Sequence, residues 1–344
     1  MADYFLGLDL GGTNIKAGIV NAAGKLLHSI NVPTGRDGDG GEENLSPNAV
    51  IRRMAAAGER VIAEARVPRK SVAAVGMGSP GQIVTARGVV LRSANLPAWK
   101  NTALRGKVSA ALKLPATLEN DAKAAAFGEW WAGAGAGKTN KNDGLFIFTL
   151  GTGVGGGLIT GGRVFHGDSD FAGEVGHTLS VAGGEPCPCG QRGCLERYCS
   201  ANAVARRAGD VLASSESIRK TSSLAEIFER TGAVSAADVA AHAQAGDAFA
   251  DEIWDETCLL LALACVNVCH LNDPKMIVLA GGMSKAGKFL VNRVNRHFRA
   301  QWWKMTKPTA TIALARLGNN AGVIGAAGVA KEAFDRNALP AIGR

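Results

Sequence analysis

The stretch FLGLDLGGTNIKAGIV at residues 5–20 decides the fold, because its plan returns later in the chain. An apolar, β-rich run leads into a turn of glycine and small polar residues, and a second apolar run follows. The segment FIFTLGTGVGGGLI at residues 146–159 has the same plan. Each copy predicts a β-hairpin with a glycine-rich turn. Two such copies predict two related α/β domains that face each other across a cleft.

Strand and helix patterns around the two hairpins complete an α/β architecture. Apolar runs predict strands at 72–78, 116–119, 275–280 and 309–315. Helical periodicity predicts helices at 49–65, 122–132, 200–213, 223–230, 235–244, 247–271, from about 285, and at 320–334. The expected domains are a small one at 1–121, on which the helix 320–334 folds back, and a large one at 122–319. Within the second, 209–235 is interpreted as an insertion or a longer helical excursion. The Gly- and Asp-rich stretch 32–45 predicts an exposed loop.

Length and composition are those of a globular protein with room for two cores. The chain has 344 residues, of which 47% are hydrophobic and 20% are charged. Its net charge of +8 comes from scattered Lys and Arg, which favours a solvated basic surface over a nucleic-acid partner. The apolar stretch 259–268 is too short to cross a bilayer, so no membrane partner is expected. Seven cysteines and no secretory leader favour a reducing, cytoplasmic location.

The two glycine turns have the composition of phosphate-binding loops. Glycine lets backbone N–H groups approach anionic oxygens closely, and threonine and asparagine side chains add further donors. The residues expected to bind nucleotide phosphates are Asp9, Gly11, Gly12, Thr13, Asn14, Lys16, Gly151, Thr152 and Gly153. Asp9 ends a predicted strand, where a carboxylate can hold Mg²⁺ directly or through water. Gly281 and Gly282, at a predicted strand-to-helix corner, support the same interpretation.

A third glycine-rich segment, AGAGAGKT at residues 132–139, fits a relaxed P-loop pattern. A P-loop follows a buried strand and opens a helix, so that the helix N-terminus faces the phosphates. This segment instead follows a predicted helix and runs into a strand. We therefore interpret it as the exit loop of that helix.

Asn120 and Asp121 stand between a predicted strand and an Ala-rich helix. One interpretation is a helix N-cap, the position where Asn and Asp are preferred. The other is that Asp121 acts as a general base, accepting a proton from a hydroxyl that attacks a phosphoryl group. Both interpretations can hold at once.

The segment EVGHTLSVAGGEPCPCGQRGCLE at 174–196 places metal-ligand side chains within one short stretch. Its ligands match a structural Cys₃His zinc site and are His177, Cys187, Cys189 and Cys194. Glu174 and Glu196 flank the cluster and are not needed for the metal, so we interpret the segment as a metal-stiffened loop that presents polar groups to something else. A zinc knuckle that binds single-stranded nucleic acid is the alternative. It requires aromatic and basic residues, and the cluster contains only Arg192.

The motifs DLGGTNIKAGIV, LENDAKAAAFGEWW, LGTGVGGGLI, EVGH and CPCGQRGCLE together resemble the ROK family of sugar kinases and sugar-responsive repressors. The resemblance covers nearly the whole chain, from Phe5 to the last helix. It implies the two-domain fold of actin, Hsp70 and hexokinase, a ribonuclease H-like ATPase fold with a cleft between the domains. The segments SPGQI at 79–83 and ANLPAW at 94–99 also resemble the substrate loops of bacterial glucokinases in that family.

The resemblance implies a role for each motif residue. Asp121 would be the catalytic base, and the zinc would be structural. The sugar would be held by Gly81, Asn95, Asn120, Asp121, Glu174, His177 and Glu196. The two glycine turns would hold the phosphates of ATP with Mg²⁺, and Gly281 and Gly282 would lie against the adenosine. A homodimer or homotetramer is implied as well.

The substrate expected from the resemblance is glucose, phosphorylated to glucose 6-phosphate. Kinases of N-acetylmannosamine, N-acetylglucosamine or fructose in the same family share the catalytic set, so they remain alternatives. A sugar-sensing repressor of the family would carry a winged helix before the first glycine turn. Because the strand of that turn begins here at about residue 4, the repressor is the less favoured alternative. Asn319 and Asn320 depart from the acidic residues that many members have before the last helix, and this departure is expected to alter the nucleotide contacts there slightly.

Overall fold

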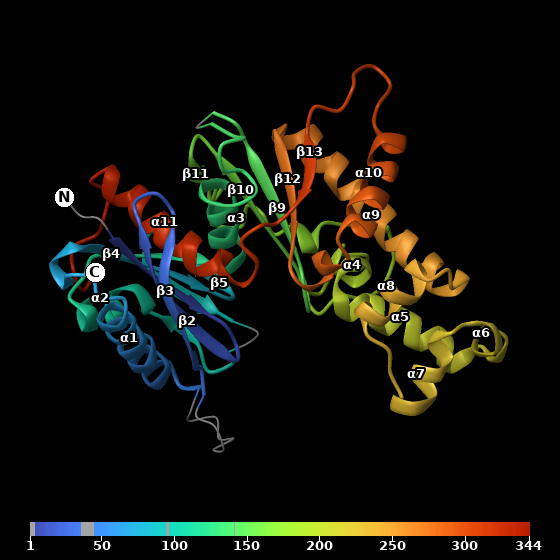
Figure 1. Ribbon diagram of the computed structural model, residues 1–344, viewed down its shortest axis with the longest axis horizontal. Helices are drawn as coiled ribbons and strands as arrows, with labels where there is room; N and C mark the ends of the chain where they lie inside the picture. Colours follow the sequence, from blue (N-terminus) through green and yellow to red (C-terminus); the bar gives the residue numbers. More distant parts are fainter. Residues whose placement is uncertain (1–3, 36–44, 94–95, 141) are drawn as a thin grey trace. The chain divides into compact units, whose positions relative to one another are not determined.

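The computed structural model describes residues 4–35, 45–93, 96–140 and 142–344. By its internal contacts the chain forms two compact units (Figure 1). The first unit comprises Met1–Asp143, Gly157–Gly173 and Arg316–Arg344, and the second comprises Gly144–Gly156 and Glu174–Ala315. These limits differ from the predicted domains, because the helix after Asn120 packs against the last helix and groups with the first unit.

The first unit is built on a five-stranded sheet of order β3-β2-β1-β4-β8. Its strands are β1 (Tyr4–Leu10), β2 (Asn14–Asn21), β3 (Leu26–Pro33), β4 (Val72–Ser79) and β8 (Ala116–Asn120). β1, β2 and β3 are antiparallel neighbours, whereas β1, β4 and β8 run parallel. The carboxyl ends of β1, β4 and β8 therefore lie at one edge of the sheet, the usual location of ligands in open α/β sheets.

Helices cover both faces of this sheet (Figure 1). α1 (Pro47–Glu64) and α2 (Leu104–Leu112) pack on one face, over the side chains of Leu6, Leu8 and Leu10. α11 (Ala321–Asp335) covers the other face and also packs against α3 (Asp121–Trp131). A small antiparallel sheet adjoins them and consists of β5 (Gln82–Val84), β6 (Val89–Arg92) and β7 (Lys100–Thr102), and a 3₁₀ turn spans Arg69–Ser71.

Backbone-to-backbone packing against α11 explains two glycines in the strands of the first sheet. A Cβ atom on Gly7 of β1 would lie 2.0 Å from the carbonyl oxygen of Val323, and one on Gly76 of β4 would lie 1.8 Å from that of Ala326. Only glycine fits at either position, because no real Cβ approaches another atom so closely. α11 therefore packs closely against β1 and β4, the strands of the first unit to which the last helix is predicted to return.

A second five-stranded sheet has the order β11-β10-β9-β12-β13. Its strands are β9 (Leu145–Leu150), β10 (Val154–Thr160), β11 (Arg163–Val164), β12 (Met276–Ala280) and β13 (Thr311–Leu314). β9, β12 and β13 are parallel. The helices of the second unit are α4 (Glu196–Cys199), α5 (Ala201–Ser214), α6 (Glu216–Thr221), α7 (Leu224–Thr231), α8 (Ala236–Gln244), α9 (Ala248–Asn272) and α10 (Lys288–Gln301).

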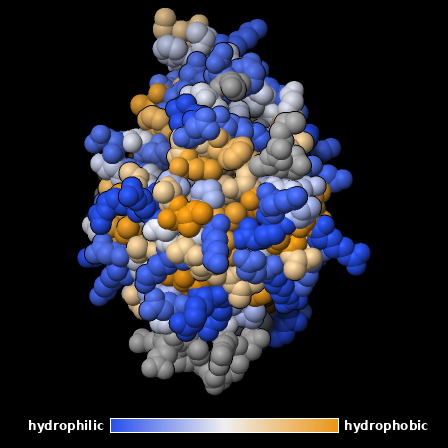
Figure 2. All heavy atoms as spheres, turned by 90° about the vertical axis from the view of Figure 1, so that its left-hand side faces the viewer, coloured by the Kyte–Doolittle hydropathy of each residue, from blue (hydrophilic) through white to orange (hydrophobic). Residues whose placement is uncertain are grey.

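The helix α9 is long and apolar enough to cross a membrane by length and composition alone. However, 67% of its most apolar window is buried inside the protein, as in the core helix of a globular unit. Cys258, Cys265 and Cys269 lie on it and are buried, so they pack in the interior of the second unit. On the face drawn in Figure 2, hydrophilic residues surround smaller areas of hydrophobic ones, as expected for scattered charges.

Most predicted elements are confirmed, and the differences have local causes. Val32 and Pro33 end β3, so this part of the predicted loop 32–45 is wrong, and residues 36–44 lie outside the described residues. The helix predicted from about 285 begins at Lys288, because Gly282–Ala286 forms a 3₁₀ turn and Gly287 has a φ of 61°. AGAGAGKT follows α3 as a loop of turns, which confirms the interpretation as an exit loop.

Candidate functional site

The first glycine turn joins β1 to β2 and is braced from two sides. Gly11 donates its backbone N–H to the carbonyl of Asn14 at 2.9 Å and accepts the Thr34 hydroxyl at 2.7 Å. Lys16 lies in β2, just after the turn. It donates its ammonium to the Asn319 carbonyl at 3.1 Å and to the Asn320 side chain. The asparagines that depart from the family pattern therefore anchor a cation beside this turn.

Asp9 lies at the carboxyl end of β1, next to the start of α11. A Cβ atom on Gly322 would lie 2.2 Å from an Asp9 carboxylate oxygen, so the helix backbone comes close to this acid. Burial, together with the nearby charge of Asp121, raises the pKa of Asp9 to about 7, and Lys16 opposes this shift. A buried carboxylate whose pKa is raised beside a second acid is typical of a site that receives a cation or a proton.

The corner between β8 and α3 holds the second carboxylate of this site. Asn120 is the N-cap of α3, and its side-chain oxygen accepts the backbone N–H groups of Ala122 at 3.0 Å and Lys123 at 3.2 Å. Its amide donates to the carbonyl of Gly81 at 3.4 Å. Asp121 is the first helical residue and accepts the N–H of Ala122 at 2.8 Å. The N-cap interpretation is confirmed for Asn120, and it places Asp121 at the positive end of the helix dipole.

The second glycine turn joins β9 to β10 and has a different brace. Gly151 donates its N–H to Gly153 at 3.0 Å, and its carbonyl accepts from Ala201 at 2.8 Å. Val154 donates its N–H to a carboxylate oxygen of Glu196 at 2.9 Å. A Cβ atom on Gly153 would lie 2.3 Å from the same oxygen, so glycine is needed for Glu196 to reach the turn.

Gly281 stands beside the second turn. It has a φ of 87°, and a Cβ atom there would lie 2.4 Å from the carbonyl oxygen of Leu150, the last residue of β9. Both the backbone conformation and the space therefore require glycine. Gly282 begins the following 3₁₀ turn and has open space around it.

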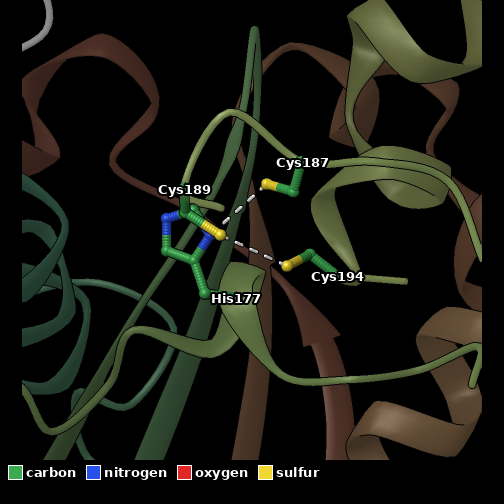
Figure 3. A group of neighbouring side chains, drawn as sticks. All are labelled: His177, Cys187, Cys189 and Cys194. Atoms are coloured by element: carbon green, nitrogen blue, oxygen red, sulfur yellow. Dashed lines mark hydrogen bonds between the residues drawn. The ribbon is translucent and has the colours of Figure 1, made fainter. Parts of the chain in front are cut away.

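The four predicted metal ligands converge in the second unit. Figure 3 shows the side chains of His177, Cys187, Cys189 and Cys194 pointing toward one another, and their ligand atoms all lie within 4.8 Å of one another. The Sγ of Cys187 is 3.9 Å from Nδ1 of His177, and the Sγ atoms of Cys189 and Cys194 are 3.6 Å apart. A tetrahedron of zinc–ligand bonds has edges of about 3.6–3.8 Å. The donor set and its spacing therefore fit zinc.

The loop that carries these ligands is shaped by tight backbone contacts. Gly193 has a φ of 84°, and a Cβ atom there would lie 1.7 Å from the carbonyl oxygen of Val181. Tyr198 of α4 accepts the N–H of Glu185 at 2.8 Å and thus fastens the loop to the helix. A backbone hydrogen bond from Gln191 lowers the pKa of Cys189 to about 7, which favours the thiolate that a metal binds.

The predicted site residues fall into two groups, one in each unit. Asp9, the first turn, Gly81, Asn120 and Asp121 belong to the first unit, whereas the second turn, Gly281, Gly282, Glu174, Glu196 and the four metal ligands belong to the second. Glu174 precedes the 3₁₀ turn Val175–His177 that carries His177. Asn95, predicted to bind sugar, lies outside the described residues.

Sequence reasoning missed a group of charged side chains behind the β8–α3 corner. Glu119 and Lys123 are only 1% and 2% exposed, and His166 and Asp170 contact them. One signal was available, because Glu119 is the only charged residue of β8, and fully buried acids are rare unless they are paired. The partners 47 residues away could not be read from the sequence.

Comparisons with known proteins show the family to which the chain is similar. The sequence profile of the ROK family matches residues 5–333. The chain is 36% identical over 330 residues to a protein named Glucokinase from Halalkalibacterium halodurans, which spans 96% of this chain and 95% of that protein. It is 32% identical over 285 residues to an N-acetylmannosamine kinase from Yersinia pseudotuberculosis, spanning 83% and 85%. A solved structure of a ROK family glucokinase from Streptomyces griseus with glucose and AMPPNP is similar at a TM-score of 0.74 and 30% identity, spanning 96% and 99%.

Proposed function

The chain belongs to the ROK family, and from this premise we infer that it is an ATP-dependent sugar kinase of the actin/hexokinase-like fold that phosphorylates glucose. The observation that carries the inference is the likeness to proteins named Glucokinase over almost the full length of both chains. The Streptomyces griseus relative binds glucose and an ATP analogue on the same fold. The acids and glycine turns described above supply what phosphoryl transfer requires.

In the proposed mechanism Asp121 is the general base. It accepts the proton of the sugar hydroxyl as that oxygen attacks the γ-phosphate. Its place at the N-terminus of α3 puts the carboxylate at the positive end of the helix dipole and holds it on a rigid element. The N-cap bonds of Asn120 fix the backbone on which Asp121 stands.

The phosphates of ATP are proposed to bind the glycine turns. Backbone N–H groups of Gly11 to Asn14 and of Gly151 to Gly153 would stabilise charge on the phosphoryl oxygens, and Gly281 and Gly282 would lie against the adenosine. The Asp9 carboxylate fits Mg²⁺. Its pKa is raised because the positive charge of Lys16 does not offset its burial, and a bound cation would supply the charge that is lacking. When bound, Mg²⁺ supplies positive charge that offsets the phosphates.

Sugar recognition is proposed for the remaining polar residues. Glu174, His177, Glu196, Asn120, Asn95 and the backbone at Gly81 would hydrogen-bond the hydroxyl groups. His177 turns Nδ1 toward the cysteines, which leaves Nε2 on the opposite side of the ring for a sugar hydroxyl. The zinc held by His177 and the three cysteines would be structural and would keep this loop in shape.

Further proposals concern the setting of the enzyme. All seven cysteines are free, which suits a reducing compartment, and we propose a cytoplasmic location. A homodimer or homotetramer is proposed as the functional form. Kinase activity toward N-acetylmannosamine is the second candidate, because a relative of that name is 32% identical over most of the chain.

An ADP-release assay coupled to a panel of hexoses and amino sugars tests the function. We expect the highest kcat/KM for glucose and a lower value for N-acetylmannosamine, N-acetylglucosamine and fructose. A higher kcat/KM for N-acetylmannosamine would replace glucose by the second candidate. No turnover of any sugar, by protein that contains zinc and is folded, would overturn the kinase assignment.

A further inference from the structure

The charged residues behind the β8–α3 corner have no role in the mechanism above. Glu119 and Lys123 flank Asn120 and Asp121 in the sequence, and both are almost completely buried. Burying a charge costs several kcal/mol unless it is paired and hydrogen-bonded. We therefore expect these two charges to have partners that hold a neighbouring segment in place beside Asp121.

Two contacts fasten this corner to the segment 166–170. At one end, Nε2 of His166 lies 2.6 Å from Oε2 of Glu119. At the other end, the ammonium of Lys123 donates to the backbone carbonyl of Asp170 at 2.6 Å. The second oxygen of Glu119 accepts the N–H of Asn120 at 2.8 Å, so the carboxylate joins the segment directly to the backbone before Asp121.

A third segment joins through the Asp170 carboxylate. It accepts the Thr85 hydroxyl at 2.7 Å and the Thr85 backbone N–H at 3.2 Å, just beyond β5 and the Gly81 loop. Asp170 adopts a left-handed backbone conformation with a φ of 62°, which is less favourable for Asp than for glycine but which Asp tolerates better than most residues. Its carbonyl and its carboxylate both have partners, Lys123 for the first and Thr85 for the second.

We propose that Glu119, Lys123, His166 and Asp170, with Thr85, form a positioning clamp that holds the β8–α3 corner so that Asp121 meets the attacking hydroxyl. They are positioning residues, since they act through the backbone of Asn120 and Asp121. The inference rests on the proposed sugar kinase activity. Its physical basis is that a displacement of about 1 Å at the reacting groups can cost on the order of 100-fold in rate.

The clamp has a pH dependence of known sign. Burial acts to lower the pKa of His166, but the hydrogen bond and charge of Glu119 outweigh it and the pKa is raised; Lys123 opposes and Asp170 supports this shift. The Glu119–His166 ion pair therefore stabilises the fold fully at a pH below the pKa that His166 has in the unfolded chain. This stabilisation is lost as the pH rises through the pKa of His166 in the folded chain. The cavity that His166 and Glu119 line also contains Arg105, Arg163, Glu332 and Arg336.

Steady-state kinetics of clamp variants test the proposal. Lys123→Met removes the ammonium at similar length, and we expect kcat to fall by tenfold or more with little change in the KM for ATP. Asp170→Gly relieves the backbone strain but removes both contacts with Thr85, and we expect it to lower kcat, whereas Asp170→Asn retains an acceptor and restores most of it. Arg163→Gln is the matched control, since it removes an exposed ion pair with Glu332 three residues before His166 and should leave kcat unchanged.

The pH profile separates positioning from a purely structural role. We expect the kcat of the wild-type protein to decline at alkaline pH as the His166 imidazolium loses its proton. Glu119→Gln keeps the hydrogen bond but removes the charge, so this decline should move to lower pH, and His166→Gln should abolish it. Circular dichroism, zinc content and glucose binding would verify that each variant is folded; if Lys123→Met is not, Thr85→Val removes only one hydroxyl.

The outcomes are distinguishable. If wild-type protein phosphorylates glucose and the folded variants keep its kcat and pH profile while only the melting temperature falls, the clamp is merely structural and the proposal is overturned. If wild-type protein phosphorylates no sugar, the proposed function fails and the clamp falls with it. Lower kcat with a shifted alkaline limb supports the clamp.

Discussion

The turn between β1 and β2 and the turn between β9 and β10 follow one sequence plan, yet different side chains surround them. Two residues before the first glycine, the first copy has Asp9 and the second has Thr149. The first turn is braced by Lys16 and has a buried acid beside it. The second is braced by Glu196, at the end of the loop 174–196 that carries the four predicted metal ligands. The two hairpins thus share a backbone plan, and what differs between them is the set of side chains that packing brings beside each turn.

The largest expected effect concerns the acids of the first unit. Asp121→Asn keeps the shape of the side chain but cannot accept a proton, so kcat should fall by about 10²–10⁴-fold. Glucose binding, measured by calorimetry, and the KM for ATP should change little. A variant with near wild-type kcat would show that Asp121 is not the base and that the difference between the two turns lies elsewhere.

The next effect concerns the loop 174–196 of the second unit, which carries the four predicted metal ligands. Metal analysis should find one zinc per chain, and Cys189→Ser should lose zinc and raise the KM for glucose by roughly 10–100-fold. Because Glu196 follows the loop and braces the second turn, the KM for ATP should rise as well. Cys269→Ala, a change of a buried cysteine outside the cluster, should keep the zinc. Protein with full activity and no zinc would contradict this account of the loop.

A third effect separates the turns by pH. Asp9 has a folded pKa of about 7 against an ordinary value of 3.8, so its ionisation destabilises the fold increasingly as pH rises from about 4 to about 7. Asp9→Asn removes this cost, on the order of 1–4 kcal/mol above pH 7. Thermal unfolding without nucleotide should therefore show a variant whose advantage over wild type grows from pH 5 to pH 8. Parallel melting curves at both pH values would argue against a raised pKa.

The smallest expected effect distinguishes two glycines of the second turn. Gly153→Ala pushes against the carboxylate of Glu196, and losing the Val154–Glu196 hydrogen bond should raise the KM for ATP roughly three- to tenfold. A Cβ on Gly151 meets nothing within 4 Å, so Gly151→Ala should keep the melting temperature of wild type. Any rise in the KM for ATP in that variant reports close approach of phosphate. Unchanged KM values in both variants would remove the second turn from the nucleotide site.

The sequence was enough for the long, strongly patterned elements and for residues that cluster within a short stretch. Both hairpins, the N-cap at Asn120 and the convergence of His177 with three cysteines follow from local spacing. The helices α4 and α6 were missed, because four and six residues are too few for helical periodicity to stand out. The contact of Glu119 with His166 was missed because it joins residues that are distant in the chain, and periodicity contains no information on such partners.

The contact of Glu196 with the second turn shows the same limit. Its position after the cysteines predicted a role beside the metal loop, and only the structure placed one of its oxygens on the N–H of Val154. Lys16 was expected to contact phosphate, yet the structure pairs it with Asn319 and Asn320. These pairings depend on how strands and helices pack, a property of the folded chain that no single segment reveals.

The packing of α11 also sets an order for folding during synthesis. Phe5 and Ala74 lie in one apolar cluster with Val323 and Ala327, so the first sheet cannot bury this face until α11 has been made. At 5–20 residues per second, the roughly 240 residues between β4 and α11 take about 12–50 s to synthesise. The second unit, encoded between them, can close first while the opening strands wait with one apolar face exposed. Chaperone dependence of the nascent chain is therefore expected to centre on β1 and β4.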